Sequence, residues 1–331
     1  MTSRERVKRA VNFAKPDKVP VTLPGEWGDD ILDVGLGANP DFIPSVPGED
    51  EWHCVWEKVS PNDKTMGQVK IHPLADYSHL MPDNSNFPNF KSETRYAHLY
   101  NIVKKNNESE NPKFVLANNP TSLGHRPEYL RGSENAWTDP FEHPKEYRKL
   151  LDILTKLGED VVENYAKAGG IDGIILYDDW GFQDRTMISP ELFDEFCVPM
   201  FSRLFKRAHD NGMMTFMHSC GHITGFMELF IKSGLDVIQM DQQENMGVDL
   251  LSEKFGGRIC FWCPVDIQQT MVNGTVQDVE NYAKKLIDKF GSFNGGFIGK
   301  WYPSAEAVNH TWEKINAMCK VFTEYGGAFY K

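Results

Sequence analysis

Apolar and polar positions alternate in two distinct patterns from residue 144 onward. The segment 144–170 has apolar residues three and four positions apart and ends in two glycines, which predicts a helix with a C-terminal stop. The segment 172–179 is a short apolar run that ends in acids, which predicts a buried strand. A helix is expected next over 189–212, because Ser-Pro-Glu favours a helix start and Gly212 favours its end.

The alternation continues to the end of the sequence. Predicted strands and helices take turns in the order strand 213–218, helix 223–234, strand 235–241, helix 247–256, strand 258–263, helix 275–291, strand 295–301 and a last helix over about 304–325. Strand followed by helix, five times over, is typical of a parallel sheet, because parallel strands need such crossovers. Continuous apolar strands indicate that both faces of the sheet are covered.

Two α/β architectures fit this order, a closed (β/α)₈ barrel and an open doubly wound sheet. The open sheet usually carries a glycine-rich phosphate loop after its first strand. The segment GLGANP, residues 35–40, does not have that spacing and is interpreted as a surface turn. The sequence therefore favours a distorted (β/α)₈ barrel of the TIM type.

The first 140 residues are less regular. They are expected to hold the first barrel strand over 18–24, a helix over about 93–106 and a second barrel strand over 113–118. Between them, residues 54–74 have the pattern of a hairpin with a turn at Pro61-Asn62-Asp63. We expect a single domain over 1–331, whose N-terminal half is elaborated by an insertion at roughly 40–110.

Composition and charge narrow the class of protein. The formal net charge is −12, which argues against nucleic-acid and anionic-membrane partners. The N-terminal segment is polar, without the apolar core of a secretion signal, and no apolar run approaches the roughly 18 residues of a spanning helix. We therefore expect a cytoplasmic protein, in which the six cysteines are core, ligand or catalytic groups rather than disulfides.

Potential metal ligands follow three successive predicted strands. His218 and Cys220 come first, Asp241 follows the next strand and Cys263 the one after. In a parallel barrel the carboxyl ends of the strands form one rim, so these side chains are expected to lie together. His218 and Cys220 are two residues apart in extended chain and point to the same side. Histidine, cysteine and aspartate are the residue types that bind zinc, so the sequence predicts a zinc site.

Each of these residues also has a plainer interpretation. Cys263 and Asp241 could serve as core packing and a loop cap, respectively. The pair Cys260 and Cys263 has the spacing of a redox motif, but an odd separation in a strand sends the two side chains to opposite faces. We therefore interpret Cys260 as a core residue.

Acids and aromatic residues are also predicted on the rim. Asp178, Asp179 and Glu26 could position a substrate or transfer a proton, although such acids also form ion pairs and helix caps. Four aromatic residues could contact a flat organic ligand there, or could belong to the core: Trp27, Trp180, Trp301 and Tyr302.

Several segments together resemble the uroporphyrinogen decarboxylase superfamily. They are TSRERVKRAVNFAKPDKVPV at the start, DDWG with ISPELFDEFCVPMFSRLFKRAHDNGM, and then FMHSCG, GLDVIQMDQQENMG and FWCPVDIQ. The resemblance extends over nearly the whole chain and implies a distorted (β/α)₈ barrel. The decarboxylase itself carries an arginine-rich segment after its first strand, whereas this chain has the acidic stretch LPGEWGDDILD. An anionic porphyrinogen would be repelled there, so the branch with corrinoid-dependent methyltransferases is the better match.

That branch holds zinc with a His-x-Cys pair and a later cysteine. The resemblance therefore implies zinc ligation by His218 and Cys220. The last-strand loop FIGKWYPSAE has no cysteine, so Asp241 and Cys263 are the candidates to complete the site, with Glu306 a more distant one. Asp241 corresponds to the acid on the next strand in the related cobalamin-independent methionine synthase. Four ligands would give a site of charge −1, while His, Cys and Asp alone would give a neutral site with one open position.

The resulting expectation is a zinc-dependent methyltransferase. It would move a methyl group between a small methylated compound, such as a methoxylated aromatic, and a separate corrinoid protein, because no cobalamin-binding module is recognised in the chain. A homodimer is a family-level expectation. Two alternatives remain at this point: a metal-independent decarboxylase or lyase that uses an acid such as Asp179, and a non-catalytic barrel that binds a corrinoid or tetrapyrrole.

Overall fold

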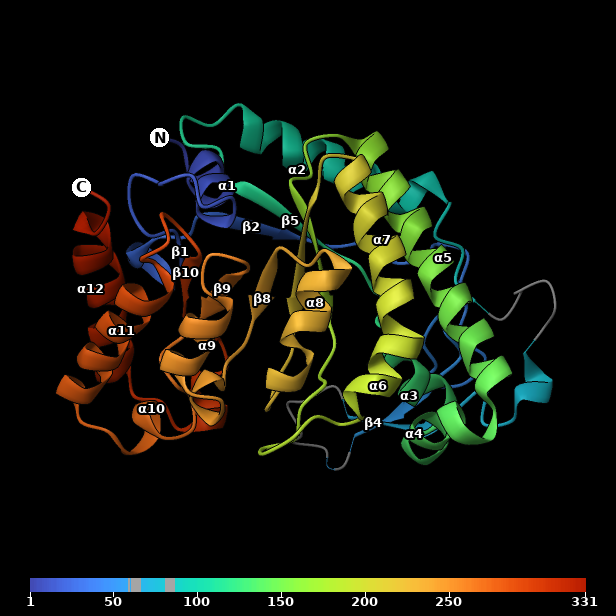
Figure 1. The fold of residues 1–331 in the computed structure, drawn as a ribbon. Coiled ribbons are helices and arrows are strands. Elements are labelled where there is room, and N and C mark those ends of the chain that lie inside the picture. The colour runs from blue at the N-terminus through green and yellow to red at the C-terminus, as the bar shows by residue number, and fades with distance from the viewer. Residues whose placement is uncertain (59, 61–66, 81–86) are drawn as a thin grey trace.

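The structure is a computed structural model that describes residues 1–331 except 59, 61–66 and 81–86. Its main sheet has eight strands in the order β1-β10-β9-β8-β7-β6-β5-β2, and each neighbouring pair is parallel. Helices surround this sheet (Figure 1). The fold is a nearly closed (β/α)₈ barrel, as the sequence predicts.

The strands of the barrel are β1 (Val21–Thr22), β2 (Ile31–Val34), β5 (Phe114–Asn118), β6 (Gly173–Tyr177), β7 (Met214–His218), β8 (Val237–Gln239), β9 (Cys260–Cys263) and β10 (Phe297–Lys300). The helices are α1 (Ser3–Val11), α2 (Ala97–Asn107), α3 (His125–Arg131), α4 (Ser133–Glu142), α5 (Pro144–Ala168), α6 (Pro190–Leu192), α7 (Val198–Asp210), α8 (Met227–Ser233), α9 (Val248–Phe255), α10 (Thr270–Asn273), α11 (Val276–Phe290) and α12 (Trp312–Ala328).

Side chains of the strands alternate between two hydrophobic clusters. One cluster fills the barrel and includes Phe216, Val237, Trp262 and Ile298. The other lies between the strands and the helices and includes their sequence neighbours, such as Met217. This period of two fixes which residues at the carboxyl ends of the strands face the barrel mouth.

The helix α1 covers the other end of the barrel. Its Val7 and Val11 belong to the cluster that fills the barrel. In Figure 1 this helix lies at the opposite end of the barrel from α3 and α4. The mouth at the carboxyl ends of the strands is therefore the end that remains for a ligand.

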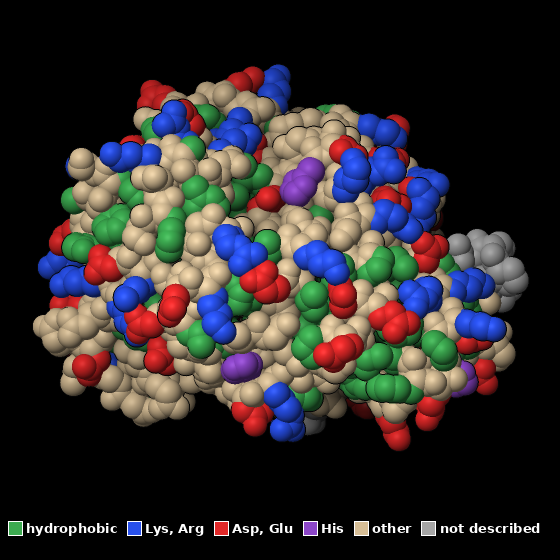
Figure 2. All heavy atoms as spheres, viewed as in Figure 1, with side chains coloured by type: hydrophobic (Ala, Val, Ile, Leu, Met, Phe, Trp, Pro, Cys, Tyr) green, Lys and Arg blue, Asp and Glu red, His purple; other side chains and the backbone are tan. Residues whose placement is uncertain are grey.

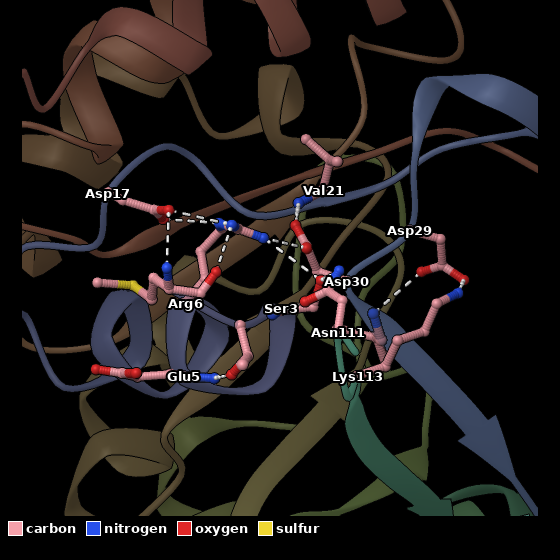
Figure 3. A network of polar contacts seen from close by, with 12 residues as sticks. Ser3, Glu5, Arg6, Asp17, Val21, Asp29, Asp30, Asn111 and Lys113 are labelled. Atoms are coloured by element: carbon pink, nitrogen blue, oxygen red, sulfur yellow. Dashed lines mark hydrogen bonds and ion pairs between the residues drawn. The ribbon is translucent and has the colours of Figure 1, made fainter. Parts of the chain in front are cut away.

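A buried ion pair holds α1 to the seam between β1 and β2. Arg6 Nη1 lies 2.6 Å from Asp30 Oδ1, and the other oxygen of Asp30 accepts a hydrogen bond from the backbone N–H of Val21 at 2.9 Å. The Arg6 guanidinium also donates to Asp17 at 2.7 Å (Figure 3). β1 and β2 are not paired as parallel strands, so these polar contacts help to close the barrel at its shortest strand.

The predicted insertion contains an antiparallel hairpin. Its strands are β3 (Val55–Glu57) and β4 (Gln68–Ile71), while the predicted turn at Pro61-Asn62-Asp63 lies outside the described residues. Trp52, Leu74 and Phe90 from this region belong to the cluster between strands and helices. The predicted helix at 93–106 corresponds to a 3₁₀ turn at Glu93–Tyr96 followed by α2.

The sequence prediction omitted β2. The prediction placed the second barrel strand at 113–118, but Ile31–Val34 precedes it and pairs with β5. This strand has only four residues and includes Asp33, so its apolar pattern is weak.

Charged side chains are intermixed on the outer surface. Figure 2 shows Lys and Arg next to Asp and Glu on the face of α7, α8 and α9 rather than a patch of one sign. Within the described residues, no helix is long and apolar enough to cross a membrane.

Candidate metal centre

His218, Cys220 and Asp179 converge at the mouth of the barrel. His218 ends β7, Cys220 follows it by two residues, and Asp179 follows the neighbouring β6. The Nε2 atom of His218 lies 3.3 Å from Cys220 Sγ and 3.3 Å from Asp179 Oδ1. Asp179 Oδ1 also accepts a hydrogen bond from the backbone N–H of Cys220 at 2.7 Å, which fixes the carboxylate.

The spacing of these three atoms fits one tetrahedral metal ion. All three potential ligand atoms lie within 4.8 Å of one another. Zinc binds nitrogen, oxygen and sulfur at about 2.0–2.3 Å, so ligand atoms of a tetrahedral site are roughly 3.3–3.6 Å apart. The two distances from His218 Nε2 agree with that range. One imidazole, one thiolate and one carboxylate can therefore hold zinc and leave a fourth position for a substrate.

The pKa values of His218, Asp179 and Cys220 depend on one another, because the three groups are in contact. Burial disfavours the charged form of His218, but hydrogen bonds to Asp179 and Cys220 outweigh it and raise the pKa of the imidazole to about 10. For Asp179, burial is likewise outweighed by His218 and by the Cys220 backbone, which lower its pKa to about 2. Burial raises the pKa of the Cys220 thiol, and His218 partly offsets it. A bound metal would replace the protons of His218 and Cys220.

Three further side chains orient the His218 ring. Its Nδ1 atom is hydrogen-bonded to Gln239 Oε1. The Gln239 amide N–H donates to Asp241 Oδ1 at 2.8 Å, and Lys300 Nζ lies 2.7 Å from the same oxygen. Because the Asp241 carboxylate accepts both bonds, the oxygen of the Gln239 amide must face His218. The ring then carries its proton on Nδ1, and Nε2 is left to bind a metal.

A pocket of about 410 Å³ opens beside these groups. Its lining includes His218, Cys220, Trp301 and Tyr302, and Tyr302 stands close enough to the cluster for the charges of Asp241, Cys220 and Asp179 to raise its pKa along with burial. Trp301 and Tyr302 therefore lie where the sequence analysis expected aromatic contacts to a ligand.

Asp178 and Trp180 have a different place from the one expected. Asp178 is fully buried and accepts hydrogen bonds from the backbone N–H groups of Leu123, Gly124 and His125 at 2.8–3.0 Å. It therefore caps the start of α3 instead of facing the pocket. Trp180 is also fully buried and packs against aromatic residues of the outer core, among them Phe193 at 4.9 Å between ring centroids. The interpretation of Trp180 as a rim residue does not hold.

The remaining expected residues also lie apart from the cluster. Cys263 faces the outer hydrophobic cluster, because Cys260 and Trp262 face the barrel interior. Asp241 faces the pocket but is paired with Lys300. Glu26 and Trp27 lie in a 3₁₀ turn after β1, and Trp27 Nε1 donates to Asn316 of α12 at 3.2 Å. The cluster of three potential ligands found among the described residues does not include Asp241, Cys263 or Glu306.

Sequence reasoning did not identify Gln239 and His125. Gln239 was missed because a glutamine inside an apolar strand has no recognisable metal signature. His125 Nε2 lies 3.7 Å from the outer oxygen of Asp179, and its position depends on the packing of α3. The period-two alternation of β8 could have indicated that Gln239 faces the same side as Asp241.

Solved structures similar to this chain include a methyltransferase with a similar fold, and two further structures superpose more weakly. A methyltransferase from Methanosarcina mazei superposes with a TM-score of 0.68 at 16% identity, over 98% of this chain and 99% of the other. A D-psicose 3-epimerase from Clostridium cellulolyticum H10 gives a TM-score of 0.42 at 8% identity, over 91% of this chain and 89% of the other. An intracellular xylanase from Thermoanaerobacterium saccharolyticum gives 0.39 at 12% identity, over 63% and 71%.

Sequence comparison identifies the family. No curated protein of similar sequence is found. The family model of uroporphyrinogen decarboxylase (URO-D) matches residues 83–323, which is well over half of the chain and includes every residue of the cluster. The chain therefore belongs to the uroporphyrinogen decarboxylase family.

Proposed function

We propose that this protein is a zinc-dependent methyltransferase that moves a methyl group between a small methylated compound and a separate corrinoid protein. The observation that carries the proposal is the convergence of His218 Nε2, Cys220 Sγ and Asp179 Oδ1 beside a pocket at the barrel mouth. The similarity in fold to a methyltransferase over nearly the full length of both chains supports it.

The proposed ligands are His218, Cys220 and Asp179. Asp179 takes the place expected for Asp241, because Asp241 is held by Gln239 and Lys300. With one neutral imidazole and two anionic ligands, a zinc ion would give a neutral site with an open position. When bound, the zinc would act as a Lewis acid on the heteroatom that carries the methyl group.

The side chains of the pocket would supply orientation rather than covalent chemistry. Trp301 and Tyr302 offer flat apolar faces for the methylated substrate, and methoxylated aromatic compounds are the first class to test. In the reaction the bond from carbon to the heteroatom breaks and its electron pair stays on the heteroatom. A reduced corrinoid on the partner protein would supply the electron pair that accepts the methyl group.

Among the described residues, the pocket lining contains no arginine that could bind an anion, which supports methyl transfer over decarboxylation of a porphyrinogen. The described residues that line the pocket include the carboxylates of Asp29, Asp33 and Asp241, and Lys300 and His218 are the groups among them that can carry a positive charge. Lys300 is already paired with Asp241. A substrate with several carboxylates would be repelled at such a site.

Methyl transfer to free cob(I)alamin tests the proposal. Wild-type protein and the variants His218→Ala and Cys220→Ser would be assayed with zinc and a panel of methoxylated aromatics, with His98→Ala as an exposed histidine control. We expect transfer with wild type and the control, and a loss of at least 100-fold in both ligand variants. Activity that survives both substitutions, or exhaustive chelation, would contradict a zinc mechanism and favour a metal-independent lyase.

A further inference from the structure

One carboxylate in the pocket has no partner. Asp33 on β2 lines the pocket, and among the described residues it makes no ion pair and no hydrogen bond. The other two carboxylates there are paired, Asp241 with Lys300 at 2.7 Å and Asp29 with Lys113 at 3.0 Å. The pair of Asp29 and Lys113 is visible in Figure 3.

Aromatic rings surround the space that Asp33 faces. Tyr177, Trp262, Trp301 and Tyr302 line the same pocket. Tyr177 is half-exposed into this space, and the nearby charge of Asp33 adds to burial in raising the pKa of its phenol to about 12. The ring of Tyr177 also lies 5.9 Å from that of His218, centroid to centroid. The rings therefore extend from the lone carboxylate to the proposed metal ligands.

Lone carboxylates and aromatic faces favour the same kind of ligand. Aromatic rings attract cations through their quadrupole, and quaternary ammonium groups are commonly recognised in this way. A carboxylate adds Coulomb attraction without requiring a hydrogen-bond donor. Lys300 already occupies one such position, because its Nζ atom lies 5.8 Å from the Tyr302 ring and beside Asp241. Among the described residues, Asp33 has no cation paired with it in this way, although the charges of Lys300 and Lys113 act on it from a distance.

We infer that the methylated substrate of this pocket carries a positively charged alkylammonium group, held between Asp33 and the aromatic rings. The inference rests on the proposed function for the role of the pocket in methyl transfer. It concerns recognition alone, so it makes and breaks no bond. It adds to that function the charge of the substrate, which the metal ligands do not determine.

A pair of isosteric probes tests the charge directly. Choline and 3,3-dimethyl-1-butanol have the same shape and differ in the charged nitrogen. Binding to the zinc-loaded protein would be measured by calorimetry, without a corrinoid. We expect choline to bind at least tenfold more tightly than the neutral isostere. Equal affinities of the two compounds would overturn the inference. So would the absence of measurable choline binding at concentrations up to about 50 mM, which is 50-fold above a dissociation constant of roughly 1 mM.

Variants assign the preference to the named residues. Asp33→Asn should remove the tenfold preference, whereas Glu253→Gln, an exposed acid on α9, should retain it. Tyr177→Phe should retain it because the ring remains, and Tyr177→Leu should reduce it at least threefold. A preference unchanged in both Asp33→Asn and Tyr177→Leu, in folded proteins, would overturn the inference.

The outcome is separable from that of the proposed function. Cation binding that depends on Asp33, together with no methyl transfer from any donor, would contradict the methyltransferase proposal and leave the cation site in place. Methyl transfer from neutral donors, together with no preference for choline over its neutral isostere, would support the methyltransferase proposal and overturn the cation site.

Discussion

At the scale of single residues, Gln239 fixes the orientation of the His218 ring. The amide is itself oriented by Asp241 and Lys300, so its oxygen can only accept the proton on His218 Nδ1. Such partners of metal-binding histidines typically change metal affinity by 10- to 100-fold when removed.

The variant Gln239→Leu tests this role. We expect the dissociation constant of zinc to rise roughly 10- to 100-fold, because His218 loses the contact that selects its tautomer. Competition with a chromophoric chelator would measure it. The exposed Gln277→Leu on α11 serves as a control and should leave the constant unchanged. A Gln239→Leu protein with wild-type zinc affinity would contradict the role assigned to this amide.

Sequence alone predicted metal ligation for two of the three residues in the cluster, His218 and Cys220. His218 and Cys220 were recognisable because they stand two apart at the end of an apolar strand. Asp179 was expected on the rim but as a catalytic acid, and Asp241 was expected as the ligand. The choice between these two acids depends on the path of the loops after β6 and β8 and on Lys300 Nζ, and no pattern in the sequence records those distances.

At the scale of elements, short strands and interrupted helices limit prediction. The strands from 172 onward were predictable because their apolar runs are continuous and lie between clear helices. The helix predicted over 189–212 is instead α6, a π-helical turn at Phe193–Cys197 and α7. Pro199 explains the interruption, because it has no N–H to donate to the preceding turn.

The contact between α7 and the start of β8 should make stability depend on pH. A hydrogen bond to Asp236 raises the pKa of His209, and burial opposes it in part. His209 Nε2 lies 2.8 Å from Asp236 Oδ2. Because the folded-state pKa exceeds the unfolded value, the stabilisation is complete below the unfolded pKa near 6.5 and is lost as pH rises through the folded value.

Urea unfolding of wild type and His209→Gln from pH 5.5 to 8.5 measures this effect. We expect wild type to have a higher free energy of unfolding than His209→Gln at pH 5.5. This difference between the two proteins should shrink toward pH 8.5. The His209 side chain is 40% exposed, so solvent screening should keep the difference below about 1 kcal/mol. A difference that grows with pH would contradict this assignment.

At the scale of the whole molecule, closure of the barrel depends on buried charge as well as on apolar packing. β1 has two residues, so the seam next to β2 relies on Arg6 and Asp30. Both side chains are more than nine-tenths buried, and removal of Arg6 leaves the buried carboxylate of Asp30 without a cation.

The variant Arg6→Ala should therefore lower the free energy of unfolding by about 3–5 kcal/mol, measured by urea titration. The exposed pair of Arg9 and Glu5 on α1 provides the control. Arg9→Ala should lower the free energy of unfolding by only about 0.5 kcal/mol. Equal effects of the two substitutions would show that the seam does not depend on the Arg6–Asp30 pair.

The overall barrel was predictable from sequence, whereas the seam was not. Five strand–helix repeats and the resemblance to the family were sufficient for the architecture. The closure relies on Asp30, which precedes β2, the one barrel strand that the pattern did not reveal.

The metal content of purified protein tests the central claim most directly. Elemental analysis after zinc loading would compare wild type with Cys220→Ser, Asp179→Asn and Cys263→Ser, the last as a cysteine control in the outer core. The account predicts about one zinc per chain in wild type and Cys263→Ser, and loss of zinc in the other two variants. No zinc in folded wild-type protein, or zinc retained by Cys220→Ser and Asp179→Asn, would contradict it.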